Sequence, residues 1–217
     1  MRSRDAGAPT ILVLIQGVCA DLTEAVVWSS HTGARQGPAL ASLLLGAQEF
    51  SGHLAQGWVR VSASTDILDY DVIASGATYL YGQSAQFAFG HGLTLAPAQW
   101  THPTLEADEN EIHVSITLER DARTPAHEVV QVYASTDPTS YVGICGAVPR
   151  LRLAGAQVTA VPAAGAARVT LSIPWSRLRS WSDSEQMFTD VRQDVTIHLA
   201  RSSASIVYSR EIVAPTS

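Results

Sequence analysis

The sequence contains no lysine, so all 14 of its basic residues are arginine, and these do not gather into one cluster. Its formal net charge is −6 and its pI is about 5.6. A protein that binds nucleic acid needs a basic face to displace counterions from phosphates, so a nucleic acid is not expected as a partner. With 46% hydrophobic and 16% charged residues, the 217-residue chain can form one large or two small folded domains.

Cysteine is also scarce, because Cys19 and Cys145 are the only two and no CxxC spacing occurs. One disulfide and two separate buried thiols both fit this pattern, but a disulfide scaffold or a zinc site does not. The seven histidines show no HxH or HExxH spacing, so we expect no metal site. The glycine-flanked stretch 33–37 before a predicted helix lacks the lysine of a phosphate-binding loop. We therefore expect no cofactor.

Long hydrophobic runs are absent as well. The longest early run, Ile11–Ile15, is too short for the core of a signal peptide and far too short to cross a bilayer. The sequence thus predicts neither export nor a membrane partner, which leaves the cytoplasm as the default compartment.

The N-terminal part has an α/β pattern. Ile11–Ile15 and Ala25–Trp28 are continuous apolar runs, typical of strands that are buried on both faces of a parallel sheet. Pro38–Leu45 reads as a short helix that Gly46 ends in the left-handed C′ position. Residues 47–75 show no periodicity and are interpreted as a long ordered loop. Residues 76–100 are rich in aromatics and glycine, which suggests a packed crossing between two domains.

From residue 111 the pattern changes to strands. Ile112, Val114, Ile116 and Leu118 alternate with polar residues, as in a half-buried strand. Further short strands are expected at Val129–Tyr133, Leu151–Val158, Ala167–Ile173, Asp194–Ala200 and Ser205–Ile212. Many short strands without helices between them predict a β-sandwich, so the fold class is mainly β. A polar connector is expected at residues 101–109, which divides the chain into domains 1–100 and 101–217.

Several strings resemble the C-terminal half of glycoside hydrolase family 3 enzymes, the β-glucosidases and β-xylosidases. The first group runs from a strand and loop to the string Phe87-Ala-Phe-Gly-His-Gly-Leu93, which resembles the "Tyr-Pro-Phe-Gly-Tyr-Gly-Leu" of that family. The earlier members of this group are Ile11–Leu22, Ala25–Trp28 with His31–Gly46, Phe50–Leu54 and Gly76–Tyr81.

The second group lies downstream. His127-Glu-Val-Val-Gln-Val-Tyr133 resembles "Asp-Glu-Val-Val-Gln-Leu-Tyr", and it is followed by Arg152–Gly155, Pro162–Thr170 and Arg201–Ser205. Together the strings cover residues 10–213 in the order of the family. The resemblance implies the end of the family's α/β sandwich domain, followed by a fibronectin type III-like (immunoglobulin-like) β-sandwich.

The resemblance also implies where catalysis would lie. In this family the nucleophile is an Asp on a barrel, and the general acid/base usually lies earlier in the α/β sandwich; both would precede residue 1. A retaining glycosidase needs both carboxylates, so we expect no catalytic residue in this sequence. The carboxylates of Asp66, Asp69 and Asp71 read as a solvated loop, and Glu106–Glu111 reads as a linker charge run. His91 lies between two glycines, which favours turn packing over catalysis.

The sequence departs from the family at polar positions. Ala34–Gly37 lacks the family's glutamate, Ala77 and His53 stand where the family has arginine, and Ala55 replaces a proline. A site that depends on hydrogen bonds would not easily tolerate such losses. We interpret the departures as the loss of charged groups at an inter-domain seam or a sugar site, typical of a structural role or of a relic.

The expected function is a non-catalytic, accessory part of a family 3 type β-glycosidase, inactive as an isolated chain, with a catalytic barrel on a separate chain as its partner. The alternative is a free-standing module that binds carbohydrate or another protein. Three tryptophans, Trp58, Trp175 and Trp181, are candidates for stacking on a polysaccharide or oligosaccharide, although packing in the core or the seam is favoured for each.

Overall fold

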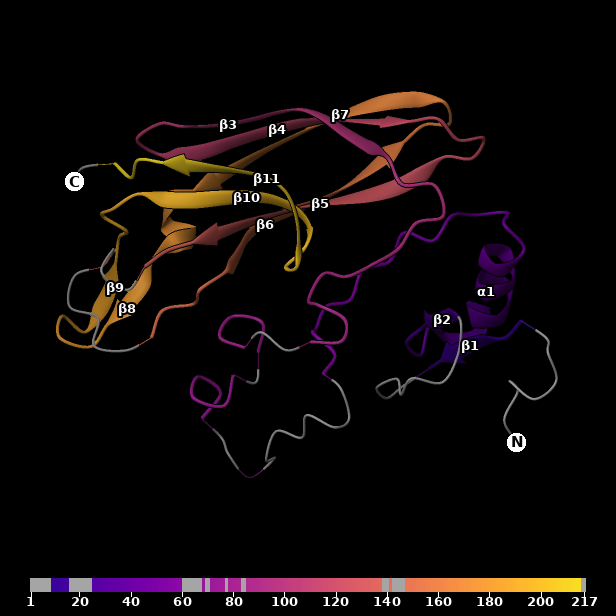
Figure 1. Ribbon diagram of the computed structural model, residues 1–217, viewed down its shortest axis with the longest axis horizontal. Helices are drawn as coiled ribbons and strands as arrows, with labels where there is room; N and C mark the ends of the chain where they lie inside the picture. The colour runs from indigo at the N-terminus through magenta and orange to yellow at the C-terminus, as the bar shows by residue number, and fades with distance from the viewer. Residues whose placement is uncertain are drawn as a thin grey trace.

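The structure is a computed structural model that describes residues 9–15, 25–59, 68, 71–76, 78–82, 85–137, 141 and 147–215. It is mostly β, in agreement with the expected fold class. A sandwich of long strands forms one part, and a small parallel sheet with one helix forms the other (Figure 1). Between them, the described residues of the connecting segment form no long strand or helix and run beneath the sandwich (Figure 1).

The sandwich consists of two antiparallel sheets. The first has the order β3-β4-β7, with strands at Gln99–Ala107, Glu111–Arg120 and Gly165–Pro174. The second has the order β11-β10-β5-β6, with strands at Ser205–Ile212, Val195–Ser202, Ala126–Ser135 and Arg152–Val161. The fibronectin type III-like character stays a prediction, which this pairing of a three-stranded with a four-stranded sheet supports.

The core lies between these two sheets. On β4, Ile112 and every second residue through Leu118 are buried, as the alternating pattern predicts. They belong to one cluster with Val132, Ile197 and Leu199 of the opposing sheet. Because successive side chains of a strand point to opposite faces, each strand gives one face to this core, and the outer face of β5 is buried at Gln131 and Tyr133.

The polar connector expected at residues 101–109 is wrong, because most of it is strand β3. Leu105 is fully buried within this strand, while its neighbours Thr104 and Glu106 are less buried. The pairing with β4 shifts between Thr101 and Thr104, where Pro103 cannot donate a ladder hydrogen bond. This irregularity hides the alternation in the sequence. The first strand of the sandwich therefore begins at Gln99.

A small hairpin was also not expected. After a 3₁₀ turn at Trp175–Leu178, strands β8 (Ser180–Ser182) and β9 (Met187–Thr189) pair antiparallel. The sequence predicts no strand between Ile173 and Asp194. Strands of three residues are too short to show a period of two.

The N-terminal part confirms the predicted α/β pattern. Strands β1 (Ile11–Leu14) and β2 (Ala25–Trp28) pair in parallel. A 3₁₀ turn at Gly33–Arg35 leads into helix α1 (Gln36–Leu44), which starts two residues before the predicted Pro38. Gly46 has a φ of +74°, the left-handed conformation expected after the helix.

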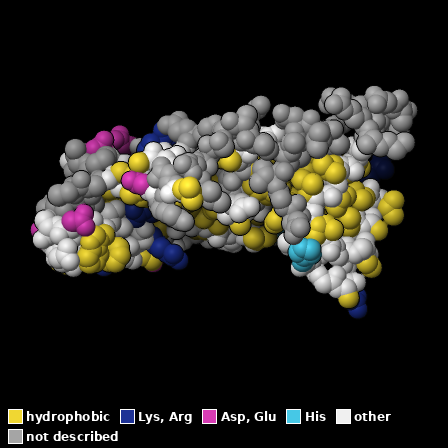
Figure 2. Space-filling model, turned by 90° about the horizontal axis from the view of Figure 1, so that it is seen from below, with side chains coloured by type: hydrophobic (Ala, Val, Ile, Leu, Met, Phe, Trp, Pro, Cys, Tyr) yellow, Lys and Arg dark blue, Asp and Glu magenta, His cyan; other side chains and the backbone are white. Residues whose placement is uncertain are grey.

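Apolar side chains are exposed in this N-terminal part. No residue of β1, β2 or α1 is buried. Leu45 is 84% exposed and Ile11 is 53% exposed, with Ile15, Trp28 and Leu44 also on the surface. Figure 2 shows hydrophobic side chains gathered at this end of the molecule. The expected apolar patch near residues 11–45 is confirmed.

Candidate functional site

Two of the family-like strings pack side by side. The backbone N–H of Leu54 donates to His91 O at 2.8 Å, and that of Gly90 donates back to Leu54 O at 2.8 Å. Farther along, Trp58 N donates to Phe87 O at 2.7 Å. The segments 51–58 and 85–92 therefore form a paired loop, although they are separated by about thirty residues in sequence. We call the contact between this loop and the sandwich the seam.

Gly90 is required by its surroundings. Its φ is +78°, and a Cβ at this position would lie 2.0 Å from Gln131 Oε1. Gly92 is similarly crowded, because a Cβ there would lie 2.3 Å from Gly52 O. An L side chain is therefore excluded at both positions. This close approach explains the Gly-His-Gly spacing of the string 87–93.

Gln131 fixes the loop from the sandwich side. Its Nε2 donates to Gly90 O at 3.0 Å and to Arg201 O at 2.7 Å. Its Oε1 accepts a hydrogen bond from the hydroxyl of Tyr133 at 2.6 Å. Burial raises the pKa of Tyr133, so this hydroxyl keeps its proton. The buried amide therefore has partners for both its oxygen and its nitrogen.

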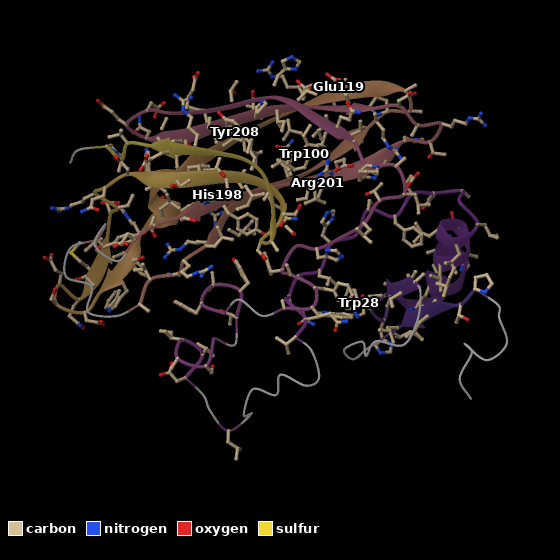
Figure 3. The ribbon with its side chains drawn as sticks, in the orientation of Figure 1. Trp28, Trp100, Glu119, His198, Arg201 and Tyr208 are labelled. Atoms are coloured by element: carbon tan, nitrogen blue, oxygen red, sulfur yellow. The ribbon has the colours of Figure 1, made fainter. Side chains whose placement is uncertain are left out.

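Glu128 and Arg201 hold the start of β3. One oxygen of Glu128 accepts the N–H of Ala98 at 2.8 Å, and the other lies 3.1 Å from Arg201 Nη1. Arg201 Nη2 also donates to Ala98 O. The guanidinium lies 4.7 Å from the ring centroid of Trp100, and Figure 3 shows these two side chains close together.

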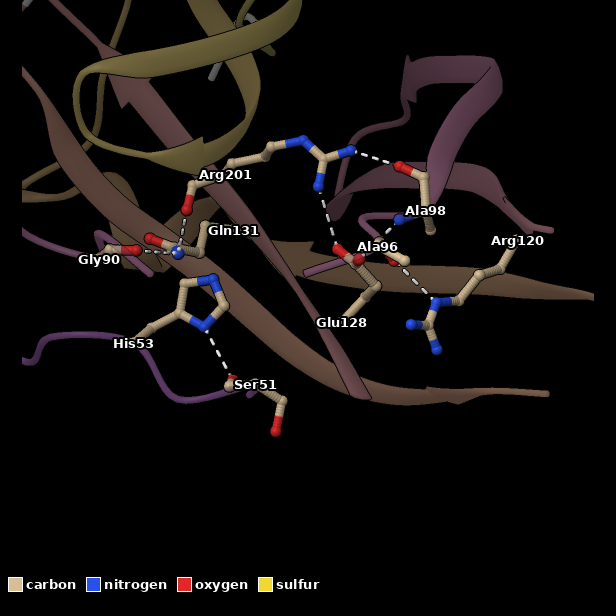
Figure 4. A network of polar contacts seen from close by, with 9 residues as sticks. All are labelled: Ser51, His53, Gly90, Ala96, Ala98, Arg120, Glu128, Gln131 and Arg201. Carbon is tan, nitrogen blue, oxygen red and sulfur yellow. Dashed lines mark hydrogen bonds and ion pairs between the residues drawn. The ribbon is translucent and has the colours of Figure 1, made fainter. Parts of the chain in front are cut away.

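A second ion pair lies nearby. Arg120 Nη2 is 3.0 Å from Glu49 Oε1, and the side chain of Arg120 is only 1% exposed. Its Nε donates to Ala96 O at 2.8 Å, and its Nη1 donates to Thr124 O. Figure 4 shows Arg120 and Glu128 around the same short stretch of loop. The departures from the family at His53 and Ala55 remain, but two ion pairs, Glu49–Arg120 and Glu128–Arg201, lie close to the seam.

His53 lies at the same seam, where the family string has arginine. Its Nδ1 is 3.1 Å from Ser51 O (Figure 4). Burial lowers its pKa, opposed by Ser51 O and the charge of Glu128. Burial also lowers the pKa of His91. Both rings are therefore neutral near pH 7.

Aromatic rings complete the contact between the two parts. Tyr79 stacks on Phe89 with a centroid distance of 4.1 Å and an angle of 11°, and it meets Tyr133 edge to face at 6.3 Å. The hydroxyl of Tyr79 accepts a hydrogen bond from Leu153 N at 3.3 Å. Trp58 contacts Trp28 of β2 at 6.0 Å. The predicted aromatic crossing between two domains is confirmed.

The three candidate tryptophans differ in exposure. Trp58 is 3% exposed and Trp175 is 7% exposed. The indole N–H of Trp175 donates to Asp108 O at 2.9 Å. Trp181 is 45% exposed. Stacking on a sugar needs a ring that solvent can reach, so the structure leaves Trp181 as the candidate for saccharide binding.

The other candidate groups have structural roles where they are described. Asp71 Oδ1 accepts the N–H groups of Ile73 and Ala74, which stabilises a turn. Asp108 accepts hydrogen bonds from His113 and two backbone N–H groups, which lower its pKa to about 2. Asp66, Asp69, Ala77, Cys19 and Cys145 lie outside the described residues.

No set of three or more His, Cys, Asp or Glu side chains within the described ranges could hold a metal ion. Over the same ranges, no helix has the length and apolar character needed to cross a membrane.

A parallel strand pair, a paired glycine loop and a sandwich thus follow one another along the chain. The family model of the glycosyl hydrolase family 3 C-terminal domain matches residues 2–95. Residues 2–95 belong to this family 3 domain. The match includes β1, β2, α1 and the paired loop, and it ends shortly before β3.

Solved structures extend the likeness across the sandwich. A β-glucosidase of Streptomyces venezuelae, solved with D-glucose, superimposes with a TM-score of 0.82 and 22% identity over 97% of this chain and 29% of its own. The family 3 β-glucosidase of Bifidobacterium adolescentis gives 0.81 and 21% over 94% and 32%. The β-D-glucoside glucohydrolase of Trichoderma reesei gives 0.82 and 18% over 97% and 34%. At these identities the likeness shows the fold.

The chain spans about a third of the length of these enzymes. A search of curated proteins finds no match to this sequence. Residues 2–95 therefore match the family 3 C-terminal domain, and the chain as a whole has the fold of the corresponding part of these enzymes.

Proposed function

We propose that these 217 residues are a non-catalytic, accessory part of a family 3 type β-glycosidase, which joins a β-sandwich to the α/β domain of the enzyme. Two polar side chains beside the paired loop support this, because Glu128 and Gln131 are buried and bound to partners within the chain. A carboxylate that is held by an arginine and a backbone N–H is not free to take up a proton or attack a sugar.

The observation that carries the proposal is the uncovered parallel strand pair. Parallel sheets are normally buried on both faces by helices or further strands. Strands β1 and β2 with helix α1 have no buried residue, and several apolar side chains around them face solvent. The surface is therefore lined by apolar side chains of the kind that are normally buried inside a domain. The segment that covers it, we propose, is the part of a family 3 enzyme that carries the catalytic barrel.

The division of the chain into domains 1–100 and 101–217 remains part of this proposal. Strand β3 begins at Gln99, so the border between the α/β part and the sandwich lies close to residue 100. Since the relatives of known structure are named β-glucosidases, we also propose a β-glucoside as the substrate class of the complete enzyme.

Activity of the chain and of its complex tests the proposal. The purified chain should not hydrolyse 4-nitrophenyl β-glucoside. Captured gently from its own cells, it should be recovered in a complex of larger native mass that does hydrolyse this substrate. The change Val27→Asp in β2 should abolish the complex and the recovered activity, because a charge on the uncovered sheet blocks burial.

The matched control is Val158→Asp, at a Val on the exposed face of β6 that is 63% exposed. It should leave both the complex and the activity unchanged. Hydrolysis by the isolated chain would overturn the non-catalytic role. Recovery as a monomer without any associated activity would instead move the weight to the alternative, a free-standing binding module, for which Trp181 supplies the one specific observation.

A further inference from the structure

The hairpin β8-β9 presents an exposed aromatic pair. Trp181 and Phe188 are directly opposite each other across the two strands, with ring centroids 5.4 Å apart at an angle of 79°. They are 45% and 59% exposed. Single exposed apolar residues are common, but two large rings in contact on a hairpin of six strand residues indicate a contact surface.

A polar pair continues the same face. Arg179 lies two residues before Trp181, and Asp190 lies two residues after Phe188, so all four side chains share one side of the hairpin. Arg179 Nε donates to Asp190 Oδ1 at 2.6 Å, and Nη2 donates to Oδ2 at 3.3 Å. About half of each of these two side chains remains exposed.

The sandwich holds the opposite side of the hairpin. Ser180 and Ser182 are buried. Arg152 of β6 donates from Nη1 to Arg179 O at 2.7 Å and from Nη2 to Ser180 Oγ at 3.0 Å. The aromatic and polar groups are therefore presented on a fixed backbone, which lowers the entropy lost when a ligand binds.

We propose that the Trp181–Phe188 and Arg179–Asp190 face is a binding site for a neutral saccharide. A sugar ring offers an apolar C–H face, which the aromatic rings can cover, and a rim of hydroxyls. The guanidinium of Arg179 can donate to those hydroxyls, and the carboxylate of Asp190 can accept from them. Because the two charges cancel, the face favours a neutral ligand over an anionic one.

The size of the surface also favours a saccharide over a protein. A fully buried aromatic side chain covers about 150–250 Å², so two half-exposed rings offer on the order of 200 Å². A stable protein interface needs about 800 Å² from each partner. One or two sugar rings match the smaller area. Figure 1 places this hairpin at the opposite end of the molecule from β1, β2 and α1, so the site is separate from the uncovered sheet.

Affinity electrophoresis of the full chain tests the site. Native gels are cast with soluble mixed-linkage β-glucan, with xylan, with starch or without polysaccharide. We expect retardation of the chain in at least one polysaccharide gel. The changes Trp181→Ala and Phe188→Ala should each weaken binding at least about tenfold, and Arg179→Ala should weaken it less. The control is Trp28→Ala, at a tryptophan that is 41% exposed at the other end of the molecule, which should bind like the unaltered chain.

The choice of β-linked probes rests on the proposed function, whereas the site itself does not. Binding that depends on Trp181 would stand even where no glycosidase complex is recovered, so the two proposals fail separately. Absence of retardation in every gel would overturn the site. So would retardation that survives both Trp181→Ala and Phe188→Ala, or self-association in sedimentation that these two changes abolish, which would make the face a contact between copies. Circular dichroism identifies any variant that does not fold. The variants that do fold then decide whether the Trp181–Phe188 face binds saccharide.

Discussion

The sandwich and the N-terminal part of the chain differ in how they are stabilised. The buried hydrophobic cluster begins at Ala98 and is formed throughout by residues of the sandwich side. Before it, the described residues contain few buried side chains, such as Trp58, and none in β1, β2 or α1. Burial of apolar surface is the main favourable contribution to folding. The sandwich thus has the core of an independent domain, while the N-terminal part needs cover from elsewhere.

The two parts also contribute different chemistry to the seam. The sandwich supplies side chains, among them Arg120, Gln131 and Arg201, and the paired loop and the residues that follow it supply backbone groups such as Gly90 O, Ala96 O and Ala98 O. Backbone groups are the same for nearly every residue type. A loop that is bound through its backbone carbonyls therefore keeps these hydrogen bonds when its side chains change. The departures at His53 and Ala55 are therefore compatible with a maintained seam and need not indicate a relic.

Cutting the chain between residues 96 and 97 should show the difference most strongly. The fragment 97–217 should fold and unfold cooperatively, because it retains the core and the contacts of Ala98 with Glu128 and Arg201. The fragment 1–96 should lack stable tertiary structure, because it buries too little apolar surface to offset its conformational entropy. Amide hydrogen exchange and urea unfolding of both fragments measure this. Cooperative unfolding of fragment 1–96 would contradict the comparison.

The next largest effect is expected at Arg120. The change Arg120→Ala should cost about 3–5 kcal/mol in the free energy of unfolding, because it leaves Glu49 buried without its partner. The double change Arg120→Met with Glu49→Leu should recover much of this loss. Arg179→Ala, which removes an exposed ion pair, serves as the control and should leave the transition unchanged. Urea unfolding followed by fluorescence measures all three, and an equal loss for the single and double changes would speak against a buried-charge cost.

Two leucines allow the stability of the sandwich and of the α/β part to be compared directly. Leu199 of β10 is fully buried in the core, whereas Leu12 of β1 is only partly buried. Leu199→Ala should cost about 2–5 kcal/mol through lost burial and the cavity that it leaves. Leu12→Ala should cost clearly less in the isolated chain. The midpoint of urea unfolding measures both, and similar losses would mean that the α/β part shares the stability of the core.

A substitution at Gly90 tests how tightly the paired loop is bound to the sandwich. Gly90→Ala places a methyl group against Gln131 Oε1 in a left-handed conformation, which costs about 1–2 kcal/mol in backbone energy alone. Hydrogen exchange should speed up in residues 85–92 and less in the sandwich strands. Gly52→Ala is the matched control, because a Cβ at Gly52 meets nothing within 4 Å. Equal protection in the two variants would show that the loop is not held by this contact.

The sequence predicted the strands whose apolar residues alternate or run on without interruption. The alternation from Ile112 to Leu118 and the runs at β1 and β2 report burial directly, so these elements were found. Strand β3 was missed because Pro103 interrupts its ladder, and the hairpin β8-β9 was missed because three-residue strands show no period.

Most of the seam was not predicted, because its polar groups meet from distant positions. Glu49 and Arg120 are 71 residues apart, and no local pattern pairs them. One signal was present, however. Arg120 continues the every-second-residue series of Ile116 and Leu118 onto the buried face of β4. A charged residue at such a position requires a partner. The string 127–133 likewise contains Glu128 and Gln131, but their partners Ala98 and Gly90 are distant in sequence.

The smallest expected effect is that of pH, and it separates the two parts once more. Burial lowers the pKa of His53 and His91 at the seam and of His198 in the sandwich. A histidine whose pKa is lower in the folded state stabilises the fold above its unfolded pKa, about 6.5, and loses this contribution as the pH falls toward the folded value. The loop should therefore open at a higher pH than the sandwich unfolds, because it has no core of its own.

His53→Gln should reduce the acid sensitivity of hydrogen exchange in residues 51–58 while that of β10 stays unchanged. His113→Gln is the control with the opposite sign, because Asp108 raises the pKa of exposed His113, so its contribution is present below pH 6.5 and is lost as the pH rises. Acid opening of the loop at the same pH as β10 in all variants would mean that seam and sandwich unfold as one unit.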